Sequence, residues 1–279
     1  MSFRLDRLAT LYVVSPLLRR ASGKRASIPI LMYHSITDKD EKGVHPYYRT
    51  ATSPSVFAEH MKYLHDHQYR TIDLVGAVSL LEAGTVREKY AVITFDDGYR
   101  DFYRDAFPEM HRYGFTATVF LPTAFIGTEP MQFKGKDCLT WNEVRELQRA
   151  KISFGSHTVN HPQLVSLDAG AVKSEIVNSR KAIEDNLGES VDSFAYPFAF
   201  PEGNRNFVQM LRNTLVESGY RQGVSTRIGT ARKQDDPYFL RRLPMNSFDD
   251  VSLFGAKLQG GYDWLHKIQY ASKLMHMYS

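Results

Sequence analysis

The chain has 279 residues, of which 43% are hydrophobic and 24% are charged, and its formal net charge is +4. This balance is typical of a globular protein, and the length suits one large α/β domain or two small ones with a sizeable core. The single cysteine, Cys138, excludes an internal disulfide. The mild positive charge permits attraction to anionic surfaces, but we expect no nucleic-acid partner.

The first 27 residues form a basic N-terminal extension in front of the first predicted strand. Its apolar stretch, from Leu8 to Leu18, is shorter than the ~20 residues that span a bilayer. Pro16 interrupts the stretch and Arg19 and Arg20 follow it, where a signal peptide would have small residues before its cleavage site. We therefore expect a protein that stays in the cytoplasm, although this pattern does not exclude export.

The same extension could hold the protein at a membrane. Leu5, Leu8, Leu11 and Tyr12 could form one apolar face of a helix, with basic residues nearby for contact with anionic lipid. The basic residues are Arg4, Arg7, Arg19, Arg20, Lys24 and Arg25. Packing on the rest of the protein and disorder are the alternatives, so peripheral membrane contact through residues 1–27 is one of three interpretations.

Strand-like and helix-like segments alternate through the rest of the chain. The apolar, β-rich runs are residues 28–33, 91–95, 116–121, 152–155, 193–196, 222–225 and 240–243. Helical spacing recurs over residues 54–67, 141–150, 167–187 and 206–218. Ser53 is a good N-cap for the first helix, and Thr140 with Glu143 forms a capping box for the second. Such alternation predicts a parallel sheet or barrel. Seven units favour an incomplete (β/α) barrel, with an open doubly wound sheet as the alternative.

We expect one domain over residues 28–254, followed by a C-terminal tail over residues 255–279. In the tail, Trp264, Ile268, Ala271 and Met275 are spaced as on one face of a helix. We expect that helix to pack on the barrel.

Two adjacent carboxylates, Asp96 and Asp97, follow the predicted strand 91–95 in the segment Thr94-Phe95-Asp96-Asp97-Gly98. Burying both is costly unless positive charge lies beside them, and a divalent cation would supply it. One aspartate could bind the metal while the other, on the other side of the chain, handles protons. Taken alone, Asp-Asp-Gly is also an ordinary strand-to-loop turn.

Two histidines, His157 and His161, follow the predicted strand 152–155. On a helical turn a spacing of four places both on one side, which suits a single metal ion; exposed loop histidines are the alternative. Both segments follow strand ends, where barrel enzymes carry their sites. One aspartate and two histidines therefore predict a three-ligand catalytic metal site with room for water.

Together these segments resemble the polysaccharide deacetylases, carbohydrate esterase family 4. The TFDDG and SHTVNH sequences are similar to the first two signature motifs of the family. Leu31–Ser35, Leu139–Trp141 and Phe194–Phe198 are similar to its early strand, to the lead-in to its histidine motif and to its third motif. The resemblance spans about residues 28–250 and is closest in motif order to poly-N-acetylglucosamine deacetylases. It implies a distorted seven-stranded (β/α) barrel in a single domain.

The resemblance also implies a role for each matching residue. Asp97, His157 and His161 would hold one divalent ion, usually zinc. Asp96 would be the general base that takes a proton from the attacking water.

The third motif, Tyr196-Pro197-Phe198, would lie at the substrate, and a backbone N–H near Phe198 would stabilise the oxyanion. His34 would be the general acid, by its similarity to the N-terminal histidine of the poly-N-acetylglucosamine deacetylases. The alternative for His34 is a strand-end histidine that hydrogen-bonds in the core.

Two positions depart from the family pattern. Ala195 stands where many members have an arginine that braces the catalytic aspartate, and Arg241 or Arg242 could replace that arginine. Residues 240–245 lack the late histidine that supplies the acid in many members, and the tail histidines His266 and His276 are weaker candidates than His34.

The expected function is hydrolysis of a linear amide: a metal-dependent enzyme that removes N-acetyl groups from an N-acetylated sugar polymer or glycan precursor. Hydrolysis of a non-sugar or cyclic amide by the same residues is one alternative, and a catalytically weak glycan-binding protein is another.

Other aromatic residues and histidines have simpler interpretations. Four aromatics could line a sugar cleft or belong to the core: Tyr99, Phe102, Trp141 and Tyr196. Three histidines lie on or near one predicted helix, and we expect them to face solvent: His60, His65 and His67.

Overall fold

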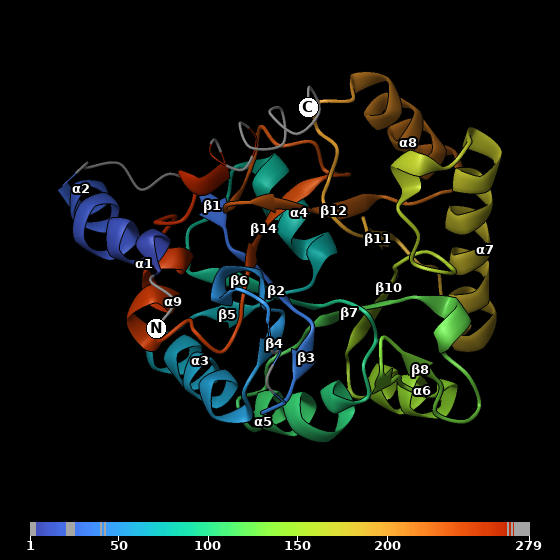
Figure 1. The fold of residues 1–279 in the computed structure, drawn as a ribbon, viewed down its shortest axis with the longest axis horizontal. Coiled ribbons are helices and arrows are strands. Elements are labelled where there is room, and N and C mark those ends of the chain that lie inside the picture. The colour runs from blue at the N-terminus through green and yellow to red at the C-terminus, as the bar shows by residue number, and fades with distance from the viewer. Residues whose placement is uncertain are drawn as a thin grey trace.

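The fold is a closed barrel of seven parallel strands, seen in the computed structural model, which describes residues 4–20, 26–39, 41, 43–266, 268 and 270 (Figure 1). In order around the barrel the strands are β2 (Ile30–Tyr33), β14 (Leu240–Pro244), β12 (Gln222–Ile228), β11 (Ser193–Ala195), β10 (Ser153–Ser156), β7 (Thr118–Leu121) and β6 (Tyr90–Phe95). Pairing of β2 with β6, Ile30 opposite Val92, closes the ring. The expected (β/α) barrel is confirmed and the open sheet is excluded.

Each of the seven predicted runs overlaps one barrel strand. The first run is divided at Pro29, which lacks an N–H for pairing, into β1 (Ser27–Ile28) and β2. A short strand, β5 (Arg70–Thr71), pairs with the beginning of β6 outside the ring.

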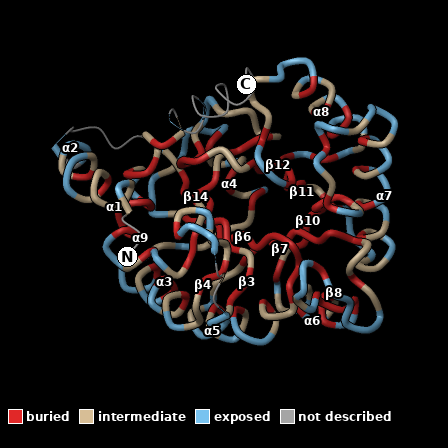
Figure 2. Tube along the Cα trace, in the orientation of Figure 1, coloured by how far each residue is buried: buried red, intermediate tan, exposed pale blue. Residues whose placement is uncertain are grey.

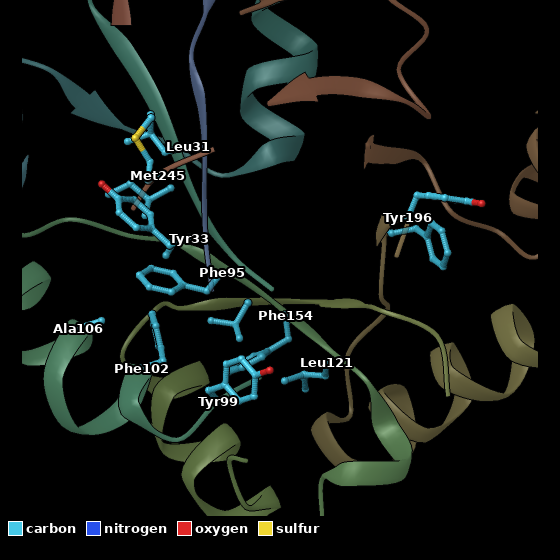
Figure 3. Packing of buried hydrophobic residues seen from close by; sticks show 14 of the residues in the cluster. Leu31, Tyr33, Phe95, Tyr99, Phe102, Ala106, Leu121, Phe154, Tyr196 and Met245 are labelled. Carbon is cyan, nitrogen blue, oxygen red and sulfur yellow. The ribbon is translucent and has the colours of Figure 1, made fainter. Parts of the chain in front are cut away.

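Successive residues of the strands contribute to two different hydrophobic clusters, as alternation along a strand requires. Val92 and Phe120 belong to the smaller cluster, whereas Ile93 and Val119 belong to the larger one. Helix α4 (Leu74–Ala83) adds Leu74, Ala77 and Leu81 to the smaller cluster. Figure 2 shows the buried residues concentrated on the strands, while the outer helices expose one side. Figure 3 shows side chains of the larger cluster, among them Tyr33, Phe95 and Phe102.

The four predicted helices are present with bounds within two residues of those expected. They are α3 (Pro54–Asp66), α6 (Trp141–Arg149), α7 (Ala169–Leu187) and α8 (Arg205–Glu217). Ser53 caps α3, and Thr140 and Glu143 form the expected capping box of α6. Helices α5 (Phe107–Arg112) and α9 (Val251–Leu258), like α4, were not foreseen.

The remaining elements are short. They are α1 (Leu5–Ala9), η1 (Thr10–Val14), α2 (Ser15–Arg20), β3 (Ser35–Ile36), η2 (Pro46–Tyr48), β4 (Ala51–Thr52), η3 (Phe102–Ala106), η4 (Thr123–Phe125), β8 (Gln132–Phe133), β9 (Lys136–Asp137), η5 (Leu164–Ser166) and β13 (Ala231–Arg232). The expected division at residues 27 and 254 stays a prediction, although α9 runs across the second boundary. Of the predicted tail face, Trp264 donates a hydrogen bond to Thr10 at 3.1 Å and Ile268 is exposed, while Ala271 and Met275 lie outside the described residues.

One histidine of α3 departs from its expected position. His65 and His67 are exposed as expected, but His60 is completely buried. Its ring stacks on Phe254 of α9 with centroids 4.0 Å apart. Burial arises because α9 covers α3, and that helix-to-helix contact joins residues nearly 200 positions apart, beyond the reach of local periodicity.

The part of the chain that the structure describes contains no helix with the length and apolarity needed to cross a bilayer. A cavity of about 410 Å³ opens at the beginnings of β7 and β10, lined by polar residues such as Thr118 and Ser153. It lies at the opposite ends of those strands from the residues considered next.

Candidate metal and catalytic site

The residues singled out in the sequence follow the carboxyl ends of barrel strands. His34 follows β2, Asp96 follows β6, His157 follows β10 and Tyr196 follows β11. All these strands are parallel members of one closed ring, so their carboxyl ends lie at the same end of the barrel.

Asp97, His157 and His161 form a buried three-residue group. One ligand atom of each lies within 4.8 Å of the others. Asp97 Oδ1 is 3.2 Å from His161 Nε2 and 3.6 Å from His157 Nε2, yet it receives no well-aligned hydrogen bond. Burial acts to raise the pKa of Asp97, but the facing His161, His34 and Lys134 outweigh it and hold the pKa below its ordinary value.

The backbone of Asp97 is held in an uncommon conformation. Asp97 has φ of 69° and Gly98 has φ of 58°, both left-handed. A Cβ at position 98 would also approach Leu121 Cδ2 to 3.0 Å. Such backbone strain in a residue other than glycine costs about 1–3 kcal/mol and persists only where the surroundings enforce it. This turn separates the directions of the two carboxylates.

His157 and His161 do not lie on a helical turn, contrary to the expectation from their spacing. The segment is a loop in which Thr158 and His161 have positive φ values of 69° and 54°. Thr158 Oγ1 accepts a hydrogen bond from the His161 N–H at 2.9 Å. Glu175 of α7 accepts from the N–H groups of Val159 and Asn160 at 2.8 and 2.9 Å. These hydrogen bonds replace a helical turn in bringing the rings together, with centroids 4.7 Å apart.

The ring of His157 is oriented by the carbonyl of Ala195, which accepts a hydrogen bond from Nδ1 at 2.8 Å. The Nε2 atom is thereby directed toward Asp97 and remains available as an acceptor. Burial lowers the pKa of His157 to about 4, so the ring is neutral near pH 7. A neutral imidazole anchored through one nitrogen is the usual form of a metal-binding histidine.

The three residues fit a divalent cation. One carboxylate and two imidazoles form a common catalytic donor set that leaves coordination positions for water and substrate. Lys134 faces Asp97 Oδ2, but Asp97 Oδ1, between the two Nε2 atoms, is a buried acceptor without a hydrogen-bond donor, as an oxygen that binds a cation would be.

Asp96 lies beside this group and is held by Arg242, whose guanidinium donates to both carboxylate oxygens. Nη1 is 2.6 Å from Oδ1 and Nη2 is 2.7 Å from Oδ2. Burial acts to raise the pKa of Asp96, but Arg242 and His157 outweigh it and keep the pKa below its ordinary value. Arg242 also donates to Ser225 O at 3.1 Å, so its own position is fixed.

Of the two arginines considered as replacements for the arginine missing at Ala195, Arg242 is the one that contacts Asp96. The sequence could not decide between Arg241 and Arg242. In the structure the two point differently: Arg241 pairs with Asp235, with Nε and Oδ1 3.2 Å apart. Alternation along β14 sends neighbouring side chains to opposite faces.

His34 also lies close to Asp96. Its Nε2 is 3.9 Å from Asp96 Oδ2, its Nδ1 has no hydrogen-bond partner, and its side chain is 18% exposed. Burial lowers the pKa of His34, partly opposed by Asp96 and Asp97. Among the tail histidines, His266 instead lies 3.5 Å from Glu202, and His276 lies outside the described residues.

The residues of the third motif, Tyr196, Pro197 and Phe198, differ in how they face the site. Tyr196 is buried among the packed hydrophobic side chains (Figure 3), with its ring centroid 5.1 Å from that of Phe200, so its ring does not face a substrate. Pro197 precedes Phe198, whose φ is 61° and whose partly exposed ring packs on His161 with centroids 4.7 Å apart. The other proposed cleft aromatics, Tyr99, Phe102 and Trp141, belong to the core.

One residue near the site was not anticipated. Lys134, at the turn between β8 and β9, lies 3.4 Å from Asp97 Oδ2. Its ammonium group also lies over the rings of Phe133 and Phe198, 4.5 and 5.5 Å from their centroids. The only sequence feature that marks this residue is a Lys-Gly pair typical of a turn. Its pairing with Asp97 depends on how the β8–β9 hairpin folds over the barrel.

Comparisons with known proteins show which family this chain resembles. The polysaccharide deacetylase family model matches residues 83–220. YxkH of Bacillus subtilis (strain 168), which carries a provisional polysaccharide deacetylase name, is 32% identical over 85% of this chain and 77% of its own length. The poly-beta-1,6-N-acetyl-D-glucosamine N-deacetylase of Staphylococcus aureus is 22% identical over 69% of this chain and 67% of its own length.

Solved structures share the fold. The Streptococcus pyogenes deacetylase PplD, solved with acetate, superimposes with a TM-score of 0.72 at 24% identity, over 83% of this chain and 98% of that one. IcaB from Ammonifex degensii gives a TM-score of 0.69 at 20% identity, over 83% and 97% of the two chains.

Proposed function

Because this chain belongs to the polysaccharide deacetylase family, a family of hydrolases that cleave the amide bond of acetylated sugars, we propose that it is a divalent-metal-dependent N-deacetylase. Its substrate would be an N-acetylated sugar polymer or a glycan precursor, and its metal would be zinc. Water attacks the acetamide carbonyl, the carbon–nitrogen bond breaks, and acetate and a free amine leave.

One observation carries the proposal. Asp96 Oδ2 lies 3.9 Å from His34 Nε2 and 4.0 Å from His157 Nε2. A single carboxylate oxygen thus lies between a partly accessible imidazole and one of the three residues that fit a metal. An acid, a base and a cation site within a few ångströms are what hydrolysis of an unreactive amide requires.

The cation would be held by Asp97, His157 and His161, where it would polarise the acetamide carbonyl and lower the pKa of water. Asp96 accepts the proton of the attacking water. Arg242 keeps Asp96 ionised at neutral pH, because it holds the pKa of that carboxylate low, and the two-pronged contact fixes the direction of the carboxylate.

The leaving amine must be protonated before it departs, and His34 is the donor that fits. Its Nε2 faces the same oxygen of Asp96, so a proton taken by Asp96 can be passed on within the site. Burial lowers the pKa of His34, which makes the protonated ring a readier donor. The left-handed backbone at Phe198 would present an N–H to the oxyanion.

The test is acetate release from N-acetylglucosamine oligomers, peptidoglycan fragments and lipid- or nucleotide-linked sugars, after chelation and with single metals added back. We expect activity only with metal. Small cyclic amides in the same assay address the alternative substrate class, and hydrolysis of these alone would replace the proposed substrate.

Variants separate the roles. Asp97→Ala, His157→Ala and His161→Ala should each lose tightly bound metal, measured by elemental analysis. Asp96→Asn should retain metal and lose about 10²–10⁴-fold in turnover. Full metal content in the three ligand variants would exclude this metal site, and normal turnover of Asp96→Asn would exclude Asp96 as the base. Glycan binding without acetate release would favour the binding-protein alternative.

A further inference from the structure

The N-terminal helix of this protein packs with its polar side inward. Segments α1, η1 and α2 form one continuous helical run from Leu5 to Arg20, which lies along α9 at one edge of the molecule (Figure 1). In a globular protein the apolar side of such a helix normally faces the core.

The inward side is held by ion pairs and hydrogen bonds. Arg4 Nη2 donates to Tyr262 Oη at 2.9 Å, and Arg7 Nε donates to Asp250 Oδ2 at 2.9 Å. Thr10 is completely buried and accepts from the Trp264 indole N–H. These contacts fix the rotation of the helix about its axis.

The outward side is apolar. Leu5 is 70% exposed, Tyr12 71% and Leu17 59%. Val13 and Leu18 are also exposed, at 56% and 41%. Together we call these five residues the apolar stripe: Leu5, Tyr12, Val13, Leu17 and Leu18. The apolar stripe differs from the apolar face that regular helical spacing predicted, which consisted of Leu5, Leu8, Leu11 and Tyr12. In the structure Leu8 and Leu11 are half-buried.

The difference follows from the π-helical segment η1 (Thr10–Val14). A π turn contains more residues than an α turn, so it shifts the phase of every residue that follows. The shift leaves Thr10 and Ser15 both buried and places Val13 and Leu17 outside. Exposing five large apolar side chains is unfavourable in water, which indicates a partner for this side.

We propose that the apolar stripe binds the surface of an anionic lipid membrane, with the helix lying in the plane of the interface. Charge favours this occupant: residues 19–25 contain Arg19, Arg20, Lys24 and Arg25 and no acidic residue. Each basic residue near an anionic bilayer strengthens binding by about fivefold. Five apolar side chains also fall far short of the ~20–30 residues that each side of a stable protein interface contributes.

The inference is independent of the proposed catalytic function. Membrane contact of this kind is reversible and peripheral, and the residues that make it are distant in sequence from Asp96, Asp97 and the site histidines. The ion pairs of Arg4 and Arg7 tie the helix to the barrel, so binding would hold the catalytic domain at the surface.

The experiment is sedimentation of the full chain with phosphatidylcholine vesicles that contain or lack phosphatidylglycerol, at low and high salt. The test variant is Tyr12→Ser/Val13→Ser/Leu17→Ser. The matched control is Val165→Ser/Val177→Ser/Val216→Ser, which removes exposed apolar residues of η5, α7 and α8; α7 and α8 lie on the opposite side of the molecule (Figure 1). A third variant, Arg19→Gln/Arg20→Gln, tests the charge.

We expect the wild type and the matched control to bind anionic vesicles at low salt. The stripe variant should bind at least about tenfold more weakly, and the charge variant about tenfold or more. Circular dichroism and acetate release from a soluble substrate should be unchanged in all of them.

Three results would overturn the proposal. The first is equal vesicle binding by the wild type and the stripe variant. The second is binding that is the same with neutral lipid and insensitive to salt. The third is a wild-type dimer, seen by light scattering, that the stripe substitutions dissociate, since this would make a second copy the occupant.

Discussion

Two groups of buried histidines in this protein differ in how many of their ring nitrogens are hydrogen-bonded to the protein. In the first, His60 uses both ring nitrogens: Nε2–H donates to Asp249 O at 2.6 Å, and Nδ1 therefore accepts from the Tyr33 hydroxyl at 2.9 Å. In the second, at the carboxyl ends of the barrel strands, His157 uses only Nδ1 for the protein, and His34 Nδ1 has no partner. Burial alone does not distinguish the two groups, because the side chains of both are largely withdrawn from solvent.

The difference lies in what is left unbonded. A buried polar atom without a partner costs about 1–3 kcal/mol, so a fold retains such atoms where something else will bind them. His60 has no capacity left for a ligand, and its group stabilises the contact between α3 and α9. At the strand ends, Asp97 Oδ1 and His34 Nδ1 remain unbonded within the described residues. Asp249 Oδ1 of the His60 group is also unbonded, but it lies 3.6 Å from the Arg4 guanidinium. The strand-end group therefore differs in having histidine nitrogens free for a ligand.

The most direct test of this difference between the two histidine groups is to make the same substitution in both. His34→Gln should fold, bind metal and lose about 10²–10⁴-fold in turnover, because the amine would lack its acid. The basic limb of its pH–rate profile should change, while the acidic limb stays. His60→Gln, the matched control, should lower the free energy of unfolding and leave turnover per folded molecule unchanged. An unaltered rate and profile in His34→Gln would place the acid elsewhere.

Both groups also contain a buried ion pair. Removing either cation should lower the free energy of unfolding, but removal of only one should change activity. Arg242→Met leaves Asp96 buried without a partner and should cost about 3–5 kcal/mol in urea unfolding. Lys257→Met should cost less. Asp249, 2.8 Å from Lys257 Nζ, also lies 3.6 Å from Arg4 Nη2 and accepts from the Asn246 N–H at 2.9 Å. Only Arg242→Met should change turnover per folded molecule. Adding Asp96→Asn to Arg242→Met should recover much of the lost stability, and strictly additive losses would contradict direct coupling.

Acid should weaken the His60 group in a defined direction. Burial lowers the pKa of His60 to about 4, below the ~6.5 of an unfolded chain. As pH falls from about 6.5 to about 4, the unfolded state binds a proton that the folded state does not bind. The free energy of unfolding should therefore fall by about 3 kcal/mol. This part of the pH dependence should be absent from His60→Gln, and an identical slope in both proteins would contradict the assignment.

A smaller effect of opposite sign is expected from Asp101, which accepts a hydrogen bond from Ser35 Oγ beside the catalytic end. Burial raises the pKa of Asp101 to about 6. Its contribution is therefore fully present below pH ~3.9 and is lost as pH rises through 6. Asp101→Asn should gain about 2 kcal/mol relative to the wild type between pH 4 and 7, measured by urea unfolding. A constant difference across this range would mean that Asp101 titrates normally.

The strands and the site could be predicted together because their signals are local. The predicted strand 91–95 is followed at once by two carboxylates, and the predicted strand 152–155 is followed closely by two histidines. Parallel strands in one barrel bring such ends together whatever the details of packing. The bounds of α6 were predictable for a similar reason, since a capping box contains its own partners.

Predictions that depended on distant contacts were incomplete or wrong. His60 was expected in solvent, because nothing near it in the sequence reveals that α9 covers it. The spacing of His157 and His161 suggested a helical turn, whereas hydrogen bonds to Thr158 and Glu175 form a loop. Lys134 was not considered, since its approach to Asp97 depends on a hairpin that crosses the end of the barrel.

The sequence by itself thus determined the barrel, the Asp97–His157–His161 group and the adjacency of Asp96. Only the tertiary structure decided between Arg241 and Arg242. Arg242 and Asp96 are 146 residues apart in the sequence, and closure of the barrel places Arg242 Nη1 2.6 Å from Asp96 Oδ1. The tertiary structure also decided which side of the N-terminal helix faces outward. Helical periodicity predicts only that the helix has two different faces. The π turn and the ion pairs of Arg4 and Arg7 determine which face packs against the barrel.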